Sequence, residues 1–343
     1  MALWFGAVIA AAVLLSCSGE ADLATEEGHD PIAFAPVAAD QEAITRAATP
    51  LNHNFTVWGY KTLAGDVLQT VFKGYNVKYA AGSAGSSADN SNGYSYVDEL
   101  HDQFIKYWDF AASEYNLWGA TGGTFGADGT TLTIGGLEQS TSEPNMEGKL
   151  FSARYHRAPV SREVVQLQFK RPYAKVRMVF YCSDRLESGD VVAIGASTFG
   201  PESPAAIVNR GTLTVTYPKT GAGQETYATT NTTTGAALAF GAVELTHTVG
   251  TASNNTALAV PAGGTEYYYV VPNRYEAPFL LTTTVEDDPK TATVPAELMN
   301  WLPNHTYTYI FKITEAGKKI EFYDVKVDPW KYGGRQEEEW RNW

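Results

Sequence analysis

The amino-acid sequence predicts an all-β protein built as two tandem antiparallel β-sandwich domains. Short segments that alternate apolar and polar residues recur along the chain with turn residues between them, which is the pattern of a sandwich. The 20 Tyr and 15 Phe residues favour strands over helices. Residues 296–302 are the one segment whose pattern indicates a helical turn. With 44% hydrophobic residues among 343, the chain can bury a sizeable core.

The first 17 residues have the pattern of a bacterial export signal. Residues 3–15 are almost wholly apolar, too short to cross a bilayer but typical of the core of a signal peptide. The run ends in Leu14-Leu15-Ser16-Cys17, which resembles a lipobox. We therefore expect a lipid on Cys17, because two or more acyl chains hold a protein stably on a membrane. A coincidental cysteine after an ordinary signal is the alternative. Met1-Ala2 departs from the signal pattern, because it lacks the usual Lys or Arg.

A polar tether and a short strand are expected next. Residues 18–31 are small, acidic and aperiodic, which is typical of a solvated segment. Large and small side chains then alternate, and this predicts a strand that carries Ile32, Phe34 and Val37. The first sandwich domain is assigned to residues 47–158. Its expected elements are strands at 55–60, 67–72 and 130–137, a loop at 80–95, and a helix or strand at 97–108, of which we favour a strand for the aromatic half.

The second sandwich domain is assigned to residues 159–343. The polar stretch 138–163, with Pro144 and Pro159, predicts the seam between the domains. Cys182 ends a strand-like run and is expected to be a buried, inert thiol. Strands are expected at 164–169, 175–180, 211–217, 238–248, 267–271, 279–285, 307–313 and 320–327.

Nothing in the sequence predicts catalysis, a metal site or a cofactor. The six histidines are scattered, and no P-loop, Gly-x-Ser-x-Gly or Cys-x-x-Cys motif is present. A net charge of −13 and a pI near 4.9 argue against nucleic acid as a partner. We do not expect an enzyme. A hydrolase with two distant carboxylates is the remote alternative, because sequence reading misses such pairs.

Three groups of segments together resemble the fimbrillin family, the type V pilus subunits of Bacteroidales. The resemblance is spread over most of the chain, and its motifs are strand patterns. The first group is Cys17 followed by the strand at Ile32–Val37 and by Thr45-Arg46-Ala47. The others are Phe55–Tyr60 with Tyr107–Ala112, and Leu302–Tyr309 with Val325–Trp330.

The resemblance implies two transthyretin-like sandwich domains and a concrete assembly mechanism. A lipoprotein precursor would reach the outer membrane and the cell surface, and its leader, residues 18–46, would be cut off by an arginine-specific surface protease. Carried onto this chain, the cut falls between Arg46 and Ala47 and removes the strand that holds Ile32, Phe34 and Val37. A strand from another pilus subunit would then fill the open groove and support adhesion. From the residues alone, an ordinary exposed arginine at position 46 is an equally good interpretation.

The resemblance also makes residues 323–330 a candidate donor strand. Ile320 and Phe322 share one face of a strand, whereas Tyr323, Val325 and Val327 share the other, which predicts a bulge between them. A Val-x-Val-x-x-Trp end that closes on Trp330 resembles a family donor strand and slightly favours a stalk subunit. The alternative is that this segment completes its own domain, as expected for a tip or accessory subunit. The connection at 314–319 has the length of a hairpin loop, which favours pairing of residues 320–322 with the preceding strand of the same domain.

A second function class stays open from the sequence. Aromatic residues make up 13% of the chain, and Trp108, Trp118 and Trp301 could stack on sugar faces. This would make the chain a permanently anchored surface lipoprotein that binds glycans. Buried tryptophans would argue against this alternative.

Overall fold

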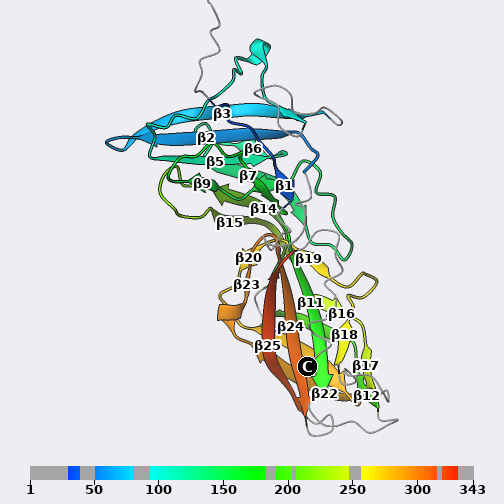
Figure 1. Cartoon of the computed structure of the whole chain (residues 1–343). Coiled ribbons are helices and arrows are strands. Elements are labelled where there is room, and N and C mark those ends of the chain that lie inside the picture. Colours follow the sequence, from blue (N-terminus) through cyan, green and yellow to red (C-terminus); the bar gives the residue numbers. More distant parts are fainter. Residues whose placement is uncertain are drawn as a thin grey trace, which may run out of the picture.

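The computed structural model describes residues 30–38, 51–80, 93–182, 191–202, 206–246, 256–314 and 319–330. Their regular secondary structure is almost entirely strand, with two short 3-10 helices, η1 (Glu99–His101) and η2 (Ala296–Leu298). Figure 1 shows an elongated molecule with two lobes, the first holding the N-terminal strands and the second the C-terminal ones. The all-β sandwich prediction is confirmed, and the helical turn expected near residue 296 is η2.

Two sheets face each other in the first lobe. The larger sheet runs in the order β1-β10-β8-β5-β2-β3-β4, with β9 on β5. Its strands are β1 (Val37–Ala38), β10 (Gln168–Lys170), β8 (Phe151–Ser152), β5 (Glu114–Ala120), β2 (Phe55–Leu63), β3 (Val67–Tyr79), β4 (Tyr94–Ser95) and β9 (Tyr155–Arg157). The smaller sheet is β15 (Thr226–Gly235), β14 (Ile207–Thr216), β7 (Thr131–Glu138) and β6 (Thr124–Phe125).

The second lobe also has two main sheets. One is β18 (Thr256–Ala259), β11 (Ala174–Cys182), β24 (His305–Thr314) and β25 (Lys319–Pro329), with β19 (Tyr268–Val270) on β11. The other is β16 (Leu238–Phe240), β13 (Ser197–Pro201), β21 (Phe279–Val285), β12 (Val191–Ile194) and β17 (Val243–Thr246), with β22 (Asp288–Val294) on β21. A small ladder joins β20 (Asn273–Arg274) to β23 (Asn300–Trp301).

Two ladders depart from the antiparallel prediction. β1 pairs with β10, and β11 pairs with β24, in parallel. A parallel pair needs a long crossover between its strands, and sequence periodicity does not report which distant strands meet. Cys182 ends β11 as a buried residue, as predicted from its apolar surroundings.

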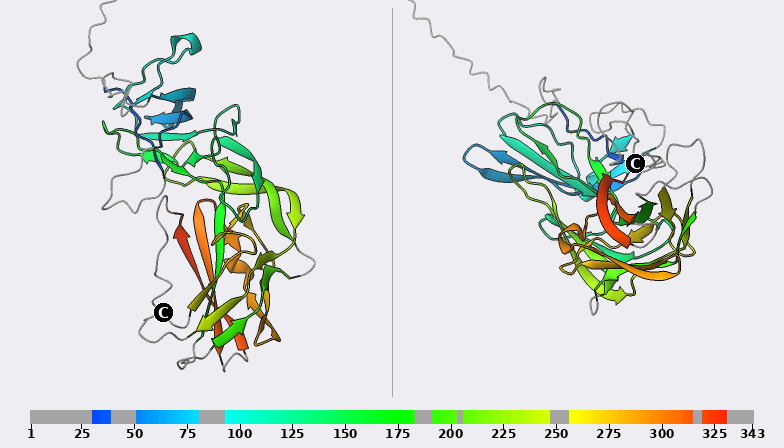
Figure 2. Two further views of the ribbon diagram at one scale, coloured as in Figure 1. Left: turned by 90° about the vertical axis from the view of Figure 1, so that its right-hand side faces the viewer. Right: turned by 90° about the horizontal axis from the view of Figure 1, so that it is seen from below.

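The lobes do not follow the expected boundary at residue 158. The hairpin of β14 and β15, taken from the expected second domain, pairs through β14 with β7 of the first lobe. In the left view of Figure 2 this yellow-green hairpin forms the lower side of the first lobe. Leu213 and Val215 of β14 are buried, and the Tyr217 ring stacks on Trp118 with the ring centroids 5.0 Å apart. The hairpin therefore supplies the apolar face that closes the first sandwich.

A buried polar network ties this hairpin to the larger sheet. The Glu225 carboxylate accepts hydrogen bonds from Lys170 Nζ at 2.5 Å, from Tyr227 Oη at 2.7 Å and from the Arg154 backbone N–H at 3.1 Å. Burial raises the pKa of Glu225, but the charge of Lys170 and these hydrogen bonds outweigh it and hold the pKa below its ordinary value. The network fixes β10 against the loop that leads into β15.

Glu225→Gln is expected to lower the free energy of unfolding at about pH 7 by about 3 kcal/mol, because it leaves the Lys170 charge without its buried partner. The lowered pKa stabilises the fold fully above the unfolded pKa, and this stabilisation is lost as the pH falls through the folded pKa. Urea denaturation should therefore show that the wild type loses more stability than the variant between about pH 7 and about pH 3.

Glu138→Gln is the matched control, because Glu138 pairs with Arg210 on the surface with both side chains more than half exposed. It should change stability by less than about 1 kcal/mol. Equal acid sensitivity in the wild type and Glu225→Gln would contradict the assignment.

Candidate functional site

The candidate site is the leader segment, residues 30–38, together with the two backbone edges that hold it. On one edge, the Ile32 N–H donates to Lys106 O at 2.7 Å, and the Trp108 N–H donates to Asp30 O at 2.9 Å. On the other edge, the Ala35 and Val37 N–H groups donate to the carbonyls of Val165 and Leu167, both at 2.9 Å. The leader segment is thus an extended segment whose first part bonds to one edge and whose later part bonds to the other, with single bridges at Pro31 and Phe34 and a two-residue strand, β1, at Val37–Ala38.

Two leader side chains fill the aromatic core of the first lobe. Ile32 is 0% exposed and Phe34 is 1% exposed. The Phe34 ring makes edge contacts with Phe55, Phe72 and Tyr96, at centroid distances of 5.8, 5.4 and 5.8 Å. The Tyr96 hydroxyl donates to Ile32 O at 2.9 Å. We call the space between the two edges, floored by these rings, the leader groove.

Val37 lies differently from the other two residues of the expected strand. Burial alternates along the segment, so that Ile32, Phe34 and Pro36 are buried, whereas Val37 is half-buried. The period of two in a strand places Val37 on the opposite face from Phe34. The inner row therefore continues through Pro36.

Burial of the leader is a large part of the stability of the first lobe. Each large apolar side chain removed from water contributes about 1.5–3 kcal/mol. Removing the strand would expose the rings of Phe55 and Phe72 and free the backbone groups at 165–167. An open sheet edge above an exposed core pairs readily with another strand.

The two ends of segment 39–50 meet beside the leader. The Leu51 N–H donates to Pro36 O at 3.1 Å, so the chain returns next to the point where it left. The expected cleavage site, Arg46 and Ala47, falls within this segment and so outside the described residues. Cys17, the expected lipidation site, also lies outside the described residues. Cleavage anywhere in 39–50 would separate the leader from the body of the first lobe.

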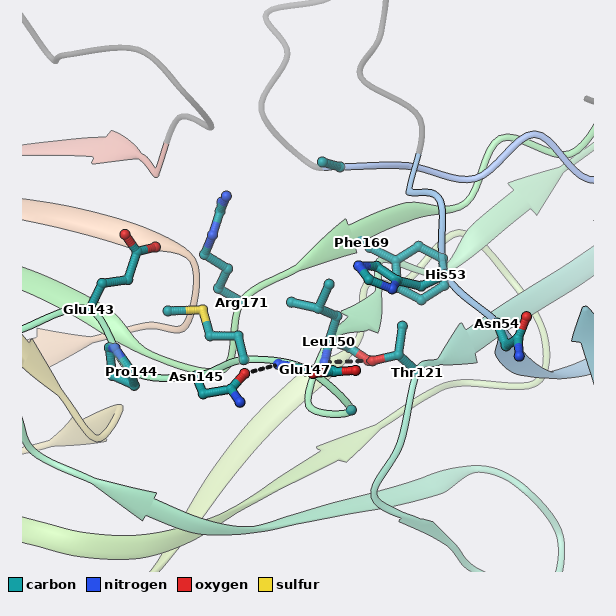
Figure 3. Close-up of a pocket in the computed structure, with 13 residues that line it drawn as sticks. His53, Asn54, Thr121, Glu143, Pro144, Asn145, Glu147, Leu150, Phe169 and Arg171 are labelled. Carbon is teal, nitrogen blue, oxygen red and sulfur yellow. Dashed lines mark hydrogen bonds between the residues drawn. The ribbon is translucent and has the colours of Figure 1, made fainter. Parts of the chain in front are cut away.

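A cavity of about 640 Å³ opens where the leader segment ends (Figure 3). Ala38 and Phe169 line it beside the leader, and Arg171, Glu143 and His53 bring charged and polar groups to its wall. Among the described residues, no three His, Cys, Asp or Glu side chains gather as a metal site would require. Because Ala38, the last described residue of the leader, lines this cavity, the cavity adjoins the end of the leader groove.

The candidate donor strand, residues 323–330, is paired within its own domain, because residues 323–329 belong to β25, which pairs with β24. β25 follows β24 along its whole length, with Val325 opposite Tyr309 and Val327 opposite Tyr307. The register shifts at Tyr323, since Phe311 faces Phe322 whereas Ile310 faces Asp324. This is the bulge predicted from the change of face between Phe322 and Tyr323.

Trp330 anchors the end of β25 between the lobes. It is buried, and its N–H donates to Asn304 O at 2.8 Å. The Arg171 guanidinium lies 5.0 Å from the Trp330 ring, and Lys175 Nζ lies 4.2 Å from it. Burial lowers the pKa of the Lys175 ammonium to about 8. Two cations on one buried ring hold the strand end by packing and by cation–π attraction.

The tryptophans proposed as sugar platforms are buried. Trp108, Trp118 and Trp301 each lie inside a lobe, and the Trp118 indole donates to Gly129 O at 2.7 Å. Rings in this position have no free face for a sugar.

The part of the chain that the structure describes contains no helix with the length and hydropathy of a membrane span.

Sequence reasoning found the leader strand but missed its partners. It expected a strand at 164–169, where the structure has β10 at Gln168–Lys170, and a strand in the aromatic half of 97–108, where the structure has no strand and that prediction is wrong. It also gave no sign that both segments border the leader. The alternation at 164–169 was the available signal, because an edge strand with an apolar inner face needs a neighbour. The exposed side chains of 97–110 were also missed.

Comparison with known proteins gives a weak likeness. No protein-family model matches the chain, and no curated protein matches it. A candidate cell adhesion protein from Bacteroides uniformis is 16% identical with a TM-score of 0.39, covering 89% of this chain and 99% of that one. Candidate cell adhesion proteins from Bacteroides ovatus and Parabacteroides distasonis are 11% and 10% identical, with TM-scores of 0.40 and 0.39, covering 89% and 90% of this chain and 99% of each of those. The function must therefore be argued from the site itself.

Phe34→Ala is expected to lower the free energy of unfolding of the uncut chain by about 3–5 kcal/mol, because it leaves a cavity among three rings. Val37→Ala is the matched control on the same strand and should cost less than half as much, since Val37 is half-buried. Urea denaturation of both variants measures the difference. Equal losses would mean that the leader does not contribute to the core through Phe34.

Trp330→Ala is expected to loosen the end of β25. Loss of a buried tryptophan costs about 3–5 kcal/mol, so amide hydrogen exchange at residues 325–328 should accelerate by roughly 100-fold or more. Val327→Ala, which changes an exposed side chain on the same strand, should leave exchange within a few-fold of wild type. Unchanged exchange in Trp330→Ala would show that the ladder with β24 suffices to hold the strand.

Proposed function

We propose that this chain is a structural subunit of a fimbrillin-type pilus on the cell surface, where it supports adhesion. It is exported as a lipoprotein through Cys17, and cleavage after Arg46 removes the leader. A strand from another subunit then enters the leader groove. The observation that carries this proposal is the leader segment itself, a strand with partners on both edges and a core side chain, Phe34, under three rings.

The leader groove supports the exchange energetically. The leader is held by edge hydrogen bonds and by the burial of Ile32 and Phe34, and an incoming strand can make the same backbone bonds. Side chains of the incoming strand at alternate positions would fill the places of Ile32, Phe34 and Pro36. Two large apolar side chains contribute about 3–6 kcal/mol in total, enough for a durable joint when added to the backbone ladder.

The position of the chain in a pilus follows from its C-terminus. While β25 stays paired with β24 and Trp330 stays buried, residues 319–330 are not available as a donor strand for a neighbouring subunit. This favours a tip or accessory position over the stalk position suggested by the Val-x-Val-x-x-Trp terminus. A permanently anchored glycan-binding lipoprotein has less support, because Trp108, Trp118 and Trp301 are buried.

Processing is tested on the native surface protein by intact mass and N-terminal sequencing. We expect a mature chain that starts at Ala47, and we expect Arg46→Ala to keep its leader and its lipid and to stay out of pili. Arg274→Ala, which changes an exposed arginine in the second lobe, is the control and should be processed normally. A wild-type chain that begins at lipidated Cys17 and is unaffected by Arg46→Ala would overturn the proposal.

A further inference from the structure

Large apolar side chains gather in the connection between β4 and β5. Leu100 is 93% exposed, Phe104 52%, Phe110 48% and Tyr107 44%, all within eleven residues. They belong to the segment that includes η1, at the far end of the first lobe in Figure 1. Single exposed apolar side chains are ordinary, but a cluster of this kind marks an interaction surface.

Buried side chains of the segment itself bind it to the rest of the first lobe and so fix the position of its exposed side chains. The Gln103 side chain is buried, accepts from the Asn76 N–H at 2.7 Å and donates to Tyr96 O at 2.8 Å. Trp108 is buried against Tyr115, with the ring centroids 4.8 Å apart. Polar and aromatic anchors thus point inward while the other apolar side chains point outward.

Two of these exposed side chains, Tyr107 and Phe110, lie at the beginning of the leader groove. Tyr107 bridges to Pro31 of the leader, and the Arg162 guanidinium lies 5.3 Å from the Phe110 ring. Val164, also exposed, precedes Val165, which bridges to Phe34 from the opposite edge. Exposed apolar groups therefore flank the leader on both sides.

A charge at the same place changes its surroundings when the leader departs. Arg162 Nε lies 2.6 Å from Asp30 Oδ2, and Asp30 belongs to the leader. Cleavage in segment 39–50 followed by loss of the leader removes this carboxylate and leaves Arg162 facing the groove entrance. The vacated position favours an acidic group on whatever enters.

We propose that Leu100, Phe104, Tyr107, Phe110, Val164 and Arg162 form a docking patch for the body of the subunit whose strand enters the leader groove. This inference rests on the proposed function and names the surface that the partner subunit covers. The patch meets the groove at Tyr107, which bridges to Pro31, and at Arg162, which pairs with Asp30, so a strand seated in the groove brings the chain segments next to it toward the patch. The partner is a second protein subunit with apolar side chains and an acidic group beside its inserted strand. The patch adds affinity that an isolated strand would lack.

The test separates strand binding from subunit docking. The full chain, processed by an arginine-specific protease, is given either a synthetic peptide of residues 30–38 or other processed subunits. Leu100→Ser with Phe104→Ser changes two exposed side chains, and Val191→Ser with Val260→Ser is the matched control in the second lobe. Peptide affinity is measured by fluorescence anisotropy and subunit association by light scattering.

We expect the patch variant to bind the peptide within about two-fold of wild type but to associate with subunits on the order of 30-fold more weakly, as for the loss of about 2 kcal/mol at an interface. The control should match wild type in both assays. Unchanged association, or an equal loss of peptide binding, overturns the docking patch while leaving strand exchange intact. Normal association with loss of binding to a host surface would make the patch an adhesive site and overturn this proposal. A processed wild type that takes neither peptide nor subunit overturns the proposed function and the patch together.

Discussion

The first lobe depends on the burial of Phe34 under the rings of Phe55, Phe72 and Tyr96. This contact places a leader residue at the centre of an aromatic cluster that the rest of the lobe builds from strands far along the chain. The edges at 106–108 and 165–167 then find their backbone partners in the same segment. One short segment satisfies both an apolar core and two rows of hydrogen-bonding groups, so its loss exposes both until another strand replaces it.

Residues from the second half of the chain stabilise the first lobe. The hairpin of β14 and β15 closes the first sandwich, and Glu225 ties its loop to Lys170 of β10, the strand that pairs with the leader at Val37. Immediately after β10, Arg171 reaches the ring of Trp330. The leader and the C-terminal strand thus contact neighbouring residues of a single connection between the lobes, although they stand at opposite ends of the sequence.

The two chain ends have different physical characters. The leader is held by a core that another strand of similar pattern could fill, and its connection to the lobe returns at Leu51 beside Pro36. The C-terminal strand is held by an unbroken ladder with β24 and by a buried indole between two cations. This difference between the two ends underlies the proposal that the chain accepts a strand at the leader groove and keeps its own C-terminal strand paired.

Local alternation in the sequence determined most of the strands, the turn at 296–298, the buried Cys182, the inward side of the leader at Ile32 and Phe34, and the bulge at Tyr323, because each depends on residues close together in the chain. The face of Val37, the hairpin that crosses the boundary at 158, and the parallel ladders of β1 and β11 were decided only by tertiary structure. Which edge a strand joins depends on apolar faces brought together from distant segments, and no local pattern records that choice. The burial of Trp108, Trp118 and Trp301 was likewise decided by packing, since an aromatic residue has the same local signature in a core and on a surface.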